Sequence, residues 1–433
     1  MSSPQNPAPD TKRDAPAGAG LAARVDSALA RGVTRVTGSA LGAYQTAVLR
    51  IGLSFTWLFF LLREWPNRHE LYGPDGPWSW DMARRLTDDN RAFTALMWSD
   101  SGAWFETVYV LAIVSSALLM LGWRTRTMSV LAMIGVLSLQ NRSIFVGDGG
   151  DNVLHLMALY MVFTRCGRVW SLDARRAARR EKAPGTCSGA DDRDLTGIVL
   201  WTLCGLALLV AQAIGDTRLE WTADGPVPGI GWATVLWGLW AAQGLWWLAR
   251  RHAPGEPRTV LDAFANLAHN GALLVIMVEV CLIYATAGWY KIQGSRWQDG
   301  TALFYPMHID YFSPWPALSH ALASSGTVVL LLSYGTVAVQ VAFPFTLLNR
   351  RVKNVLLAVM MAEHLGIALT LGLPFFSLAM IVADAVFLPT SFLRRMGALV
   401  GRAGNRLPLA RRGAVPAPRE SEDGAAGTRT LVG

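Results

Sequence analysis

Apolar residues along the chain gather in blocks separated by polar and Arg-rich stretches. Most blocks are about 17 to 22 residues long, the length at which a helix crosses a hydrocarbon core of ~30 Å. Ten such blocks predict an all-α fold, a polytopic transmembrane helical bundle. The predicted spans are 44–62, 104–122, 126–140, 152–164, 195–213, 231–249, 271–290, 327–348, 354–371 and 374–388.

Several of these spans have alternatives. The blocks 126–140 and 152–164 are short, so they cross only with tilt or local thinning of the bilayer. The last two blocks are separated only by the segment from Gly372 to Pro374. Residues 354–388 therefore form either two spans or a re-entrant pair.

Two tails flank the predicted membrane domain at 41–390. Residues 1–40 are rich in Ala, Pro and Gly and are expected to be disordered or amphipathic. Within them, 21–36 carries an amphipathic repeat with three arginines, which suits either a helix on an anionic membrane surface or a solvated tail. Residues 391–433 return to Arg, Gly and Pro and are expected to be a disordered basic tail.

Composition supports a membrane protein and excludes an ordinary soluble enzyme. The chain is 52% hydrophobic and 16% charged, against a soluble norm of roughly 25% charged residues. Its basic residues are almost all Arg, and they concentrate in the loops and tail that this layout places inside. The positive-inside rule then puts both termini in the cytoplasm of a multi-pass protein of the cell membrane. No nucleic-acid partner is predicted.

The first polar segment on the predicted outer side joins the third and fourth spans, at 140–152. Asp151 and His155 are four residues apart, so they share one helix face. Asn152 lies between them. Gly149 and Gly150 form a turn, and Asp151 or Asn152 suits the N-cap of the following helix. The segment is therefore either a helix cap or part of a site.

The second polar segment, at 284–303, contains Lys291. The chain has only four lysines, and Lys291 is the one in a predicted outer segment. Arg stays protonated, whereas a desolvated Lys can lose its proton and act as a base. The alternative is an interfacial Lys that extends its ammonium group to water at a helix end.

Ionisable residues also lie inside the predicted spans: Glu279, Glu363, His364 and Asp384. Such groups are costly in lipid and face the bundle interior. We expect His364 to point at the centre and its neighbour Glu363 to reach a partner at the side. Each alone is equally explained by a structural hydrogen bond. Arg50 is expected to extend to the headgroups.

The order of these features resembles the vitamin K-dependent gamma-carboxylase family and its bacterial relatives, the HTTM (horizontally transferred transmembrane) domain proteins. The resemblance covers about residues 45 to 390. It rests on Arg50-Ile51-Gly52-Leu53, Leu121-Gly122-Trp123-Arg124-Thr125-Arg126, Trp170-Ser171-Leu172-Asp173, Ala287-Gly288-Trp289-Tyr290-Lys291-Ile292, Trp297-Gln298-Asp299-Gly300, and His364 with Leu371-Gly372-Leu373-Pro374-Phe375-Phe376.

The resemblance implies that Lys291 is the base that deprotonates a hydroquinone. It also implies a quinone as cofactor, menaquinone or a vitamin K-like molecule. The cofactor site would contain Asp151, Asn152, His155, Trp297 and His364. The sequence departs from the carboxylases at the Gly149 to Asn152 segment, where they carry an Asn and His pair. It also lacks a counterpart of their large lumenal C-terminal domain, so only the membrane half is expected.

Two functions follow as hypotheses. The first is a quinone-linked membrane enzyme that uses Lys291 as a base, related to carboxylases or oxidoreductases. The second is a non-catalytic protein that transports or handles a small lipid or peptide. The expected partners are membrane lipid, a quinone, and a peptide or small-molecule substrate. The sequence contains no nucleotide-binding loop, HExxH motif or Cys/His cluster, so no metal is predicted.

Overall fold

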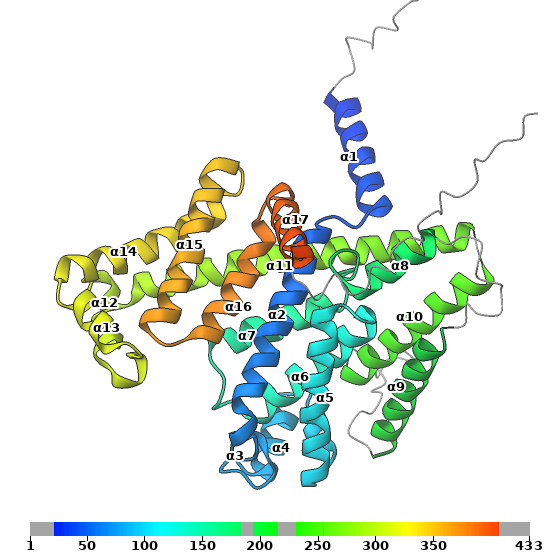
Figure 1. Cartoon of the computed structure of the whole chain (residues 1–433), viewed down its shortest axis with the longest axis horizontal. Coiled ribbons are helices and arrows are strands. Elements are labelled where there is room, and N and C mark those ends of the chain that lie inside the picture. Colours follow the sequence, from blue (N-terminus) through cyan, green and yellow to red (C-terminus); the bar gives the residue numbers. More distant parts are fainter. Residues whose placement is uncertain (1–20, 183–193, 215–230, 254, 407–433) are drawn as a thin grey trace, which may run out of the picture. The chain divides into compact units, whose positions relative to one another are not determined.

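The computed structural model describes residues 21–182, 194–214, 231–253 and 255–406, and within these ranges it is helical with no β-strand (Figure 1). The all-α prediction is confirmed for them. In chain order the α-helices are α1 (Leu21–Gly38), α2 (Ala43–Glu64), α3 (Arg68–Tyr72), α4 (Trp80–Asp89), α5 (Gly102–Leu121), α6 (Thr125–Arg142), α7 (Gly149–Met161), α8 (Leu172–Lys182), α9 (Leu195–Ile214), α10 (Trp232–His252), α11 (Glu256–Gln293), α12 (Ser295–Gln298), α13 (Pro316–Ala323), α14 (Gly326–Ala342), α15 (Arg350–Thr370), α16 (Pro374–Asp384) and α17 (Thr390–Arg406).

Six helical segments among the described residues are long and apolar enough to cross a membrane. A seventh is added if the broken pair Pro374–Phe387 and Thr390–Arg402 acts as one span. The sequence predicts ten. The six are Ala43–Tyr72, Gly102–Leu121, Leu195–Ile214, Glu256–Gln293, Gly326–Thr346 and Arg350–Thr370.

The remaining predicted spans do form helices, but they fall short of those six in length or apolar character. Helix α7 has 13 residues, about 20 Å at about 1.5 Å per residue, which is less than the hydrocarbon thickness. Helix α6 has 18 residues and ends in the polar run Gln140-Asn141-Arg142. The predictions of ten crossings and of cytoplasmic termini remain proposals.

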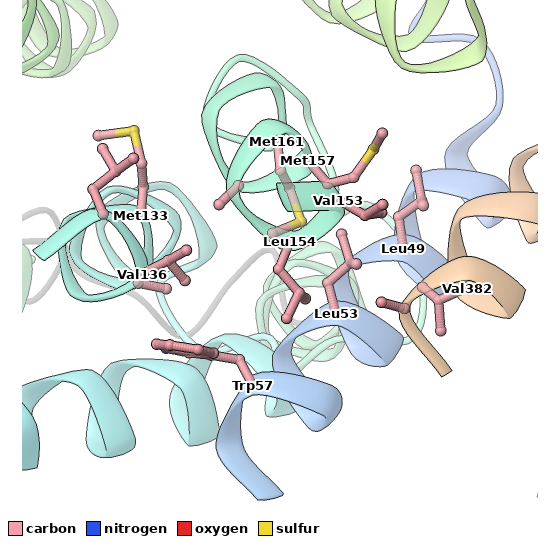
Figure 2. Close-up of a cluster of buried hydrophobic side chains, with 14 of the residues drawn as sticks. Leu49, Leu53, Trp57, Met133, Val136, Val153, Leu154, Met157, Met161 and Val382 are labelled. Atoms are coloured by element: carbon pink, nitrogen blue, oxygen red, sulfur yellow. The ribbon is translucent and has the colours of Figure 1, made fainter. Parts of the chain in front are cut away.

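The apolar core lies where α2, α6, α7 and α16 meet, and Figure 2 shows the side chains that fill it. Gly52 permits a close approach of α2 to α16, because a Cβ at this position would lie 2.3 Å from Cγ2 of Val382 in α16. The labelled core residues are Leu49, Leu53, Trp57, Met133, Val136, Val153, Leu154, Met157, Met161 and Val382.

Arg50 does not reach the headgroups, so that prediction is wrong. Its side chain is completely buried, and it donates hydrogen bonds only to backbone carbonyls. Nη1 bonds Leu119 O at 2.6 Å and Met120 O at 2.7 Å, Nη2 bonds Trp170 O at 2.7 Å, and Nε bonds Cys166 O at 3.3 Å. The first two belong to the last turn of α5, whose carbonyls have no partner within the helix.

The turn after α5 completes this junction. Gly122 has a φ of 74° and ends α5 in the left-handed conformation that glycine adopts without strain. A Cβ there would lie 2.3 Å from Ser171 Cβ and 2.8 Å from Arg50 Nη1. Asp173 then accepts hydrogen bonds from the backbone N–H groups of Arg124 and Thr125, at 3.0 and 2.8 Å. Three motifs of the family resemblance therefore meet in one structural junction.

Helix α1 is tied to α11 by its C-terminal end. Asn270 Nδ2 donates to Val36 O and Ser39 O, each at 2.8 Å, and Asn266 Nδ2 donates to Thr37 O at 2.8 Å. Residues 23–35 of α1 are exposed, and the place of this helix on a membrane surface stays a prediction. Residues 1–20 lie outside the described residues.

The described residues divide into two compact units at the Leu388–Pro389 bond. In the second unit, 390–406 form α17, so the prediction of a disordered tail from 391 is wrong for this segment. Apolar side chains recur at helical spacing along it, and this pattern favours an amphipathic helix over a disordered tail. Residues 407–433 lie outside the described residues.

Candidate functional site

Lys291 lies in the last turn of α11, where α14 packs closely against it (Figure 1). Gly288, three residues earlier, permits this approach, because a Cβ there would lie 2.6 Å from Cγ2 of Val341. The contact brings Lys291 Nζ to 2.8 Å from Oε1 of Gln340. Nε2 of Gln340 in turn donates to Glu363 Oε1 on α15, at 2.7 Å. Three helices thus hold a Lys–Gln–Glu chain.

The Gln340 amide separates a cation from an anion. An ammonium group only donates hydrogen bonds, so the amide oxygen faces Lys291 and the amide NH₂ faces the carboxylate. Among the residues that the structure describes, no carboxylate forms an ion pair with Lys291. Nζ also lies 5.3 Å from the ring centroid of Trp297, within the range of a cation–π contact.

A pocket of about 620 Å³ opens beside Lys291. Its walls come from α7, α11 and α12, so the two polar segments singled out in the sequence do approach each other here. Most of its lining is apolar or aromatic, with Lys291 as the cationic group. The lining residues are Gly149, Asn152, Val153, Leu156, Ile283, Thr286, Ala287, Tyr290, Lys291 and Trp297.

Asp151 and His155 do not line this pocket. Both reach Gln140 on α6: Gln140 Nε2 donates to Asp151 at 3.4 Å, and His155 Nδ1 lies 3.2 Å from Gln140 Oε1. Asp148 and Asp151 form a reciprocal capping box at the start of α7. Burial raises the pKa of Asp151 to about 6. The helix-cap interpretation accounts for Asp151, and the contact with Gln140 accounts for His155.

Asp299 is also engaged away from Lys291. Its carboxylate accepts hydrogen bonds from the hydroxyl and the backbone N–H of Thr301, at 2.5 and 3.0 Å. These bonds lower the pKa of Asp299, whose side chain is exposed. Asp151 and Asp299, which lie in the two polar segments, therefore bond other groups and leave Lys291 without a direct counter-ion.

His364 is buried inside the bundle, as predicted, and is 2% exposed. Its Nε2 lies 2.9 Å from the hydroxyl of Tyr284, and that hydroxyl lies 3.0 Å from Asp384 Oδ2. Glu363 reaches Gln340 at the side, also as predicted. Of the predicted cofactor residues, Asn152 and Trp297 line the pocket and His364 does not.

Sequence reasoning missed Gln340 and the role of Tyr284. Gln340 is the single amide in α14, whose other polar residues carry only hydroxyl groups, and an amide at that depth is a signal for a buried partner. Tyr284 precedes Lys291 by seven residues, two helical turns, so it shares the face of α11 that carries Lys291.

A comparison of the chain with known protein families, with curated proteins and with solved structures finds no match. The resemblance to HTTM proteins therefore rests on the motifs in the sequence. The described residues include no group of three or more His, Cys, Asp or Glu side chains that could hold a metal ion. The chemistry available at the pocket is that of one lysine in an apolar, aromatic surround.

Proposed function

We propose that this chain is a multi-pass protein of the cell membrane that binds a quinone-like molecule in the Lys291 pocket and uses Lys291 as a proton acceptor. The observation that carries the proposal is the open pocket beside a lysine that no carboxylate contacts. In the proposed topology the bundle crosses the membrane ten times, both termini are cytoplasmic, and the pocket opens on the outer side. Relationship to the HTTM proteins is part of the same proposal.

The lining suits a flat, apolar ring system. Val153, Leu156, Ile283 and Ala287 offer an apolar wall, and Trp297 offers an aromatic face. A volume of about 620 Å³ falls in the range of small-molecule sites. A quinone supplies a ring hydroxyl or carbonyl that exchanges protons and electrons. Lys291 is the one group in the lining that would take up such a proton.

The Lys–Gln–Glu chain is arranged to stabilise the cation that forms at Lys291. A neutral Lys291 presents a lone pair, and on accepting a proton it gains a third N–H donor. Gln340 Oε1 and the Trp297 ring face that charge at 2.8 and 5.3 Å. Glu363 adds a negative charge one amide further away, close enough to help but outside ion-pair range. A direct carboxylate contact would hold Lys291 charged before any ligand arrives.

The test uses the full chain in lipid nanodiscs with reduced menadione as the probe. Binding is measured by quenching of Trp fluorescence, and proton transfer by the ultraviolet spectrum of the bound probe, which differs between its protonated and deprotonated forms. We expect the wild type to bind the deprotonated form. Lys291→Arg should keep binding within about tenfold and lose the deprotonated spectrum, because Arg cannot act as a base.

Lys353→Arg is the matched control, since Lys353 lies on α15 and donates to the backbone carbonyl of Phe387. It should behave like the wild type. Binding with a protonated spectrum in every variant would refute the base and favour a non-catalytic protein that handles small lipids. Absence of binding to the wild type would refute the quinone itself.

A further inference from the structure

A second cluster of titratable groups lies at the centre of the bundle and takes no part in the proposed pocket chemistry. Tyr284 from α11, His364 from α15 and Asp384 from α16 are each at most 2% exposed. The Tyr284 hydroxyl lies between the other two, 2.9 Å from His364 Nε2 and 3.0 Å from Asp384 Oδ2. A single hydroxyl therefore links an imidazole to a carboxyl group.

This arrangement has two complete hydrogen-bonding states. In the first, His364 Nε2–H donates to the hydroxyl oxygen and the hydroxyl donates to a carboxylate at Asp384. In the second, a protonated Asp384 donates to the hydroxyl oxygen and the hydroxyl donates to His364 Nε2. A tyrosine hydroxyl both donates and accepts, so either direction satisfies all three groups.

The two ends of the chain have unused hydrogen-bonding positions. His364 Nδ1 and Asp384 Oδ1 are buried and have no partner among the described residues. Polar atoms at such depth are nearly always paired, and the exceptions mark sites with a further role. One end can take a proton and the other can hold or release it.

We propose that His364, Tyr284 and Asp384 form a proton-transfer chain through the core of the bundle. A proton binds at His364 Nδ1. The proton on Nε2 leaves and forms a bond to the Tyr284 oxygen, and the original hydroxyl proton leaves that oxygen and forms a bond to Asp384 Oδ2. Histidine and tyrosine end neutral, Asp384 ends as a neutral acid, one proton has moved, and no electrons are transferred.

The surroundings fit a carboxyl group that changes its charge. The titratable groups that act on Asp384 are Tyr284 and Cys281 from α11 and Glu363 from α15. His364 from α15 is linked to Asp384 through the Tyr284 hydroxyl, and Lys291 acts on His364. From α2 and α7 the neighbours of α16 include Leu53 and Val153, which lie near Val382 (Figure 2). No Lys or Arg pairs with Asp384 among the described residues, and a carboxylate without a cation gains from binding a proton.

The inference does not depend on a quinone. The Lys–Gln–Glu chain and the His–Tyr–Asp chain share two helices, α11 and α15, but no residue. Loss of one chain by substitution leaves the groups of the other in place. Intramembrane chains of acid and histidine carry protons in pumps and transporters, so the cluster suits a protein that couples a step to proton movement.

The experiment is a pH titration of the full chain in lipid nanodiscs, between about pH 4 and pH 10, a range that starts near the pKa of exposed acids and includes that of exposed histidines. Infrared difference spectra report the protonated carboxyl, and ¹⁵N chemical shifts report the His364 ring. Asp384→Asn and His364→Gln assign the signals. The chain takes up one proton, and that uptake changes both the carboxyl group and the imidazole tautomer. An apparent pKa of coupled groups belongs to the set and not to one residue, so we expect both signals to change at the same pH.

Tyr284→Phe removes only the linking oxygen. It should separate the two signals by at least about one pH unit, because imidazole and carboxyl then titrate independently. Tyr311→Phe, at a position that is 84% exposed, is the matched control and should leave the single step. A single step that persists in Tyr284→Phe, or a wild type without a carboxyl band that Asp384→Asn removes, would overturn the proposal.

Discussion

Arg50 allows a quantitative test of the junction between α2, α5 and the segment after α7. The substitution Arg50→Lys keeps the charge but replaces a planar fork with a single ammonium group. The fork makes four hydrogen bonds to carbonyls on separate segments. An ammonium near Leu119 and Met120 cannot also reach Cys166 and Trp170, so at least two of the four are lost.

Each hydrogen bond to a charged group contributes about 1.5 to 3 kcal/mol, so the expected loss of unfolding free energy is about 3 to 6 kcal/mol. Arg63→Lys is the matched control on the same helix. Arg63 is 53% exposed and pairs with its neighbour Glu64, and such pairs contribute about 0 to 1 kcal/mol. Unfolding is followed by Trp fluorescence as sodium dodecyl sulfate is titrated into mixed micelles. Equal unfolding free energies for Arg50→Lys and Arg63→Lys would refute the idea that the buried hydrogen bonds of Arg50 stabilise the junction.

Three further predictions test other parts of the molecule. Gly122→Ala should lower the unfolding free energy by more than about 1 kcal/mol, because a left-handed backbone and two close contacts oppose the new methyl group; Gly366→Ala, in open space within a helix, should raise it by about 0.5 to 1 kcal/mol in the same assay. The Arg124 guanidinium lowers the pKa of the Asp194 carboxyl, so this ion pair stabilises the fold above the unfolded pKa of about 4 and is lost as the pH falls through the folded value. The wild type should melt at a higher temperature than Asp194→Asn above about pH 4, and the difference should shrink as the pH falls further, through the lowered folded pKa. A difference that does not shrink over this fall in pH would contradict the assignment. Gln340→Glu puts a carboxylate directly on the pocket lysine, and the bound probe should then show only its protonated spectrum; an unchanged spectrum would show that the amide is not needed.

The sequence predicts this molecule well where a property is local. Blocks of apolar residues locate the six span-length segments, and the cost of a bare imidazole in lipid places His364 inside. Spacing alone does not tell which side of a helix faces a site. Asp151 and His155 share a face of α7 as expected, but that face meets Gln140 rather than the pocket.

Long-range partners are what the pattern along the chain leaves out. The place of Arg50 near the end of a predicted span favours a contact with the lipid headgroups. The carbonyls that it binds instead lie 69 to 120 residues away along the chain. The amide of Gln340 is hydrogen-bonded to Lys291 on α11 and to Glu363 on α15, so its role depends on two other helices. Such roles depend on how helices pack, and packing is decided by small residues such as Gly52 and Gly288 as much as by the large ones.

Helix α11 has 38 residues, about 57 Å at about 1.5 Å per residue. A bilayer core of ~30 Å covers only about half of that length when the helix is upright. If the Lys291 end of α11 lies at one membrane surface, the helical turn from Asn266 to Asn270 lies in the water or headgroup layer on the other side. This turn binds the backbone at the C-terminal end of α1. A single helix, α11, then connects the two membrane surfaces. Because α1 is bonded near one end of α11 and the lysine pocket lies at the other, a change in the tilt of α11 would move both.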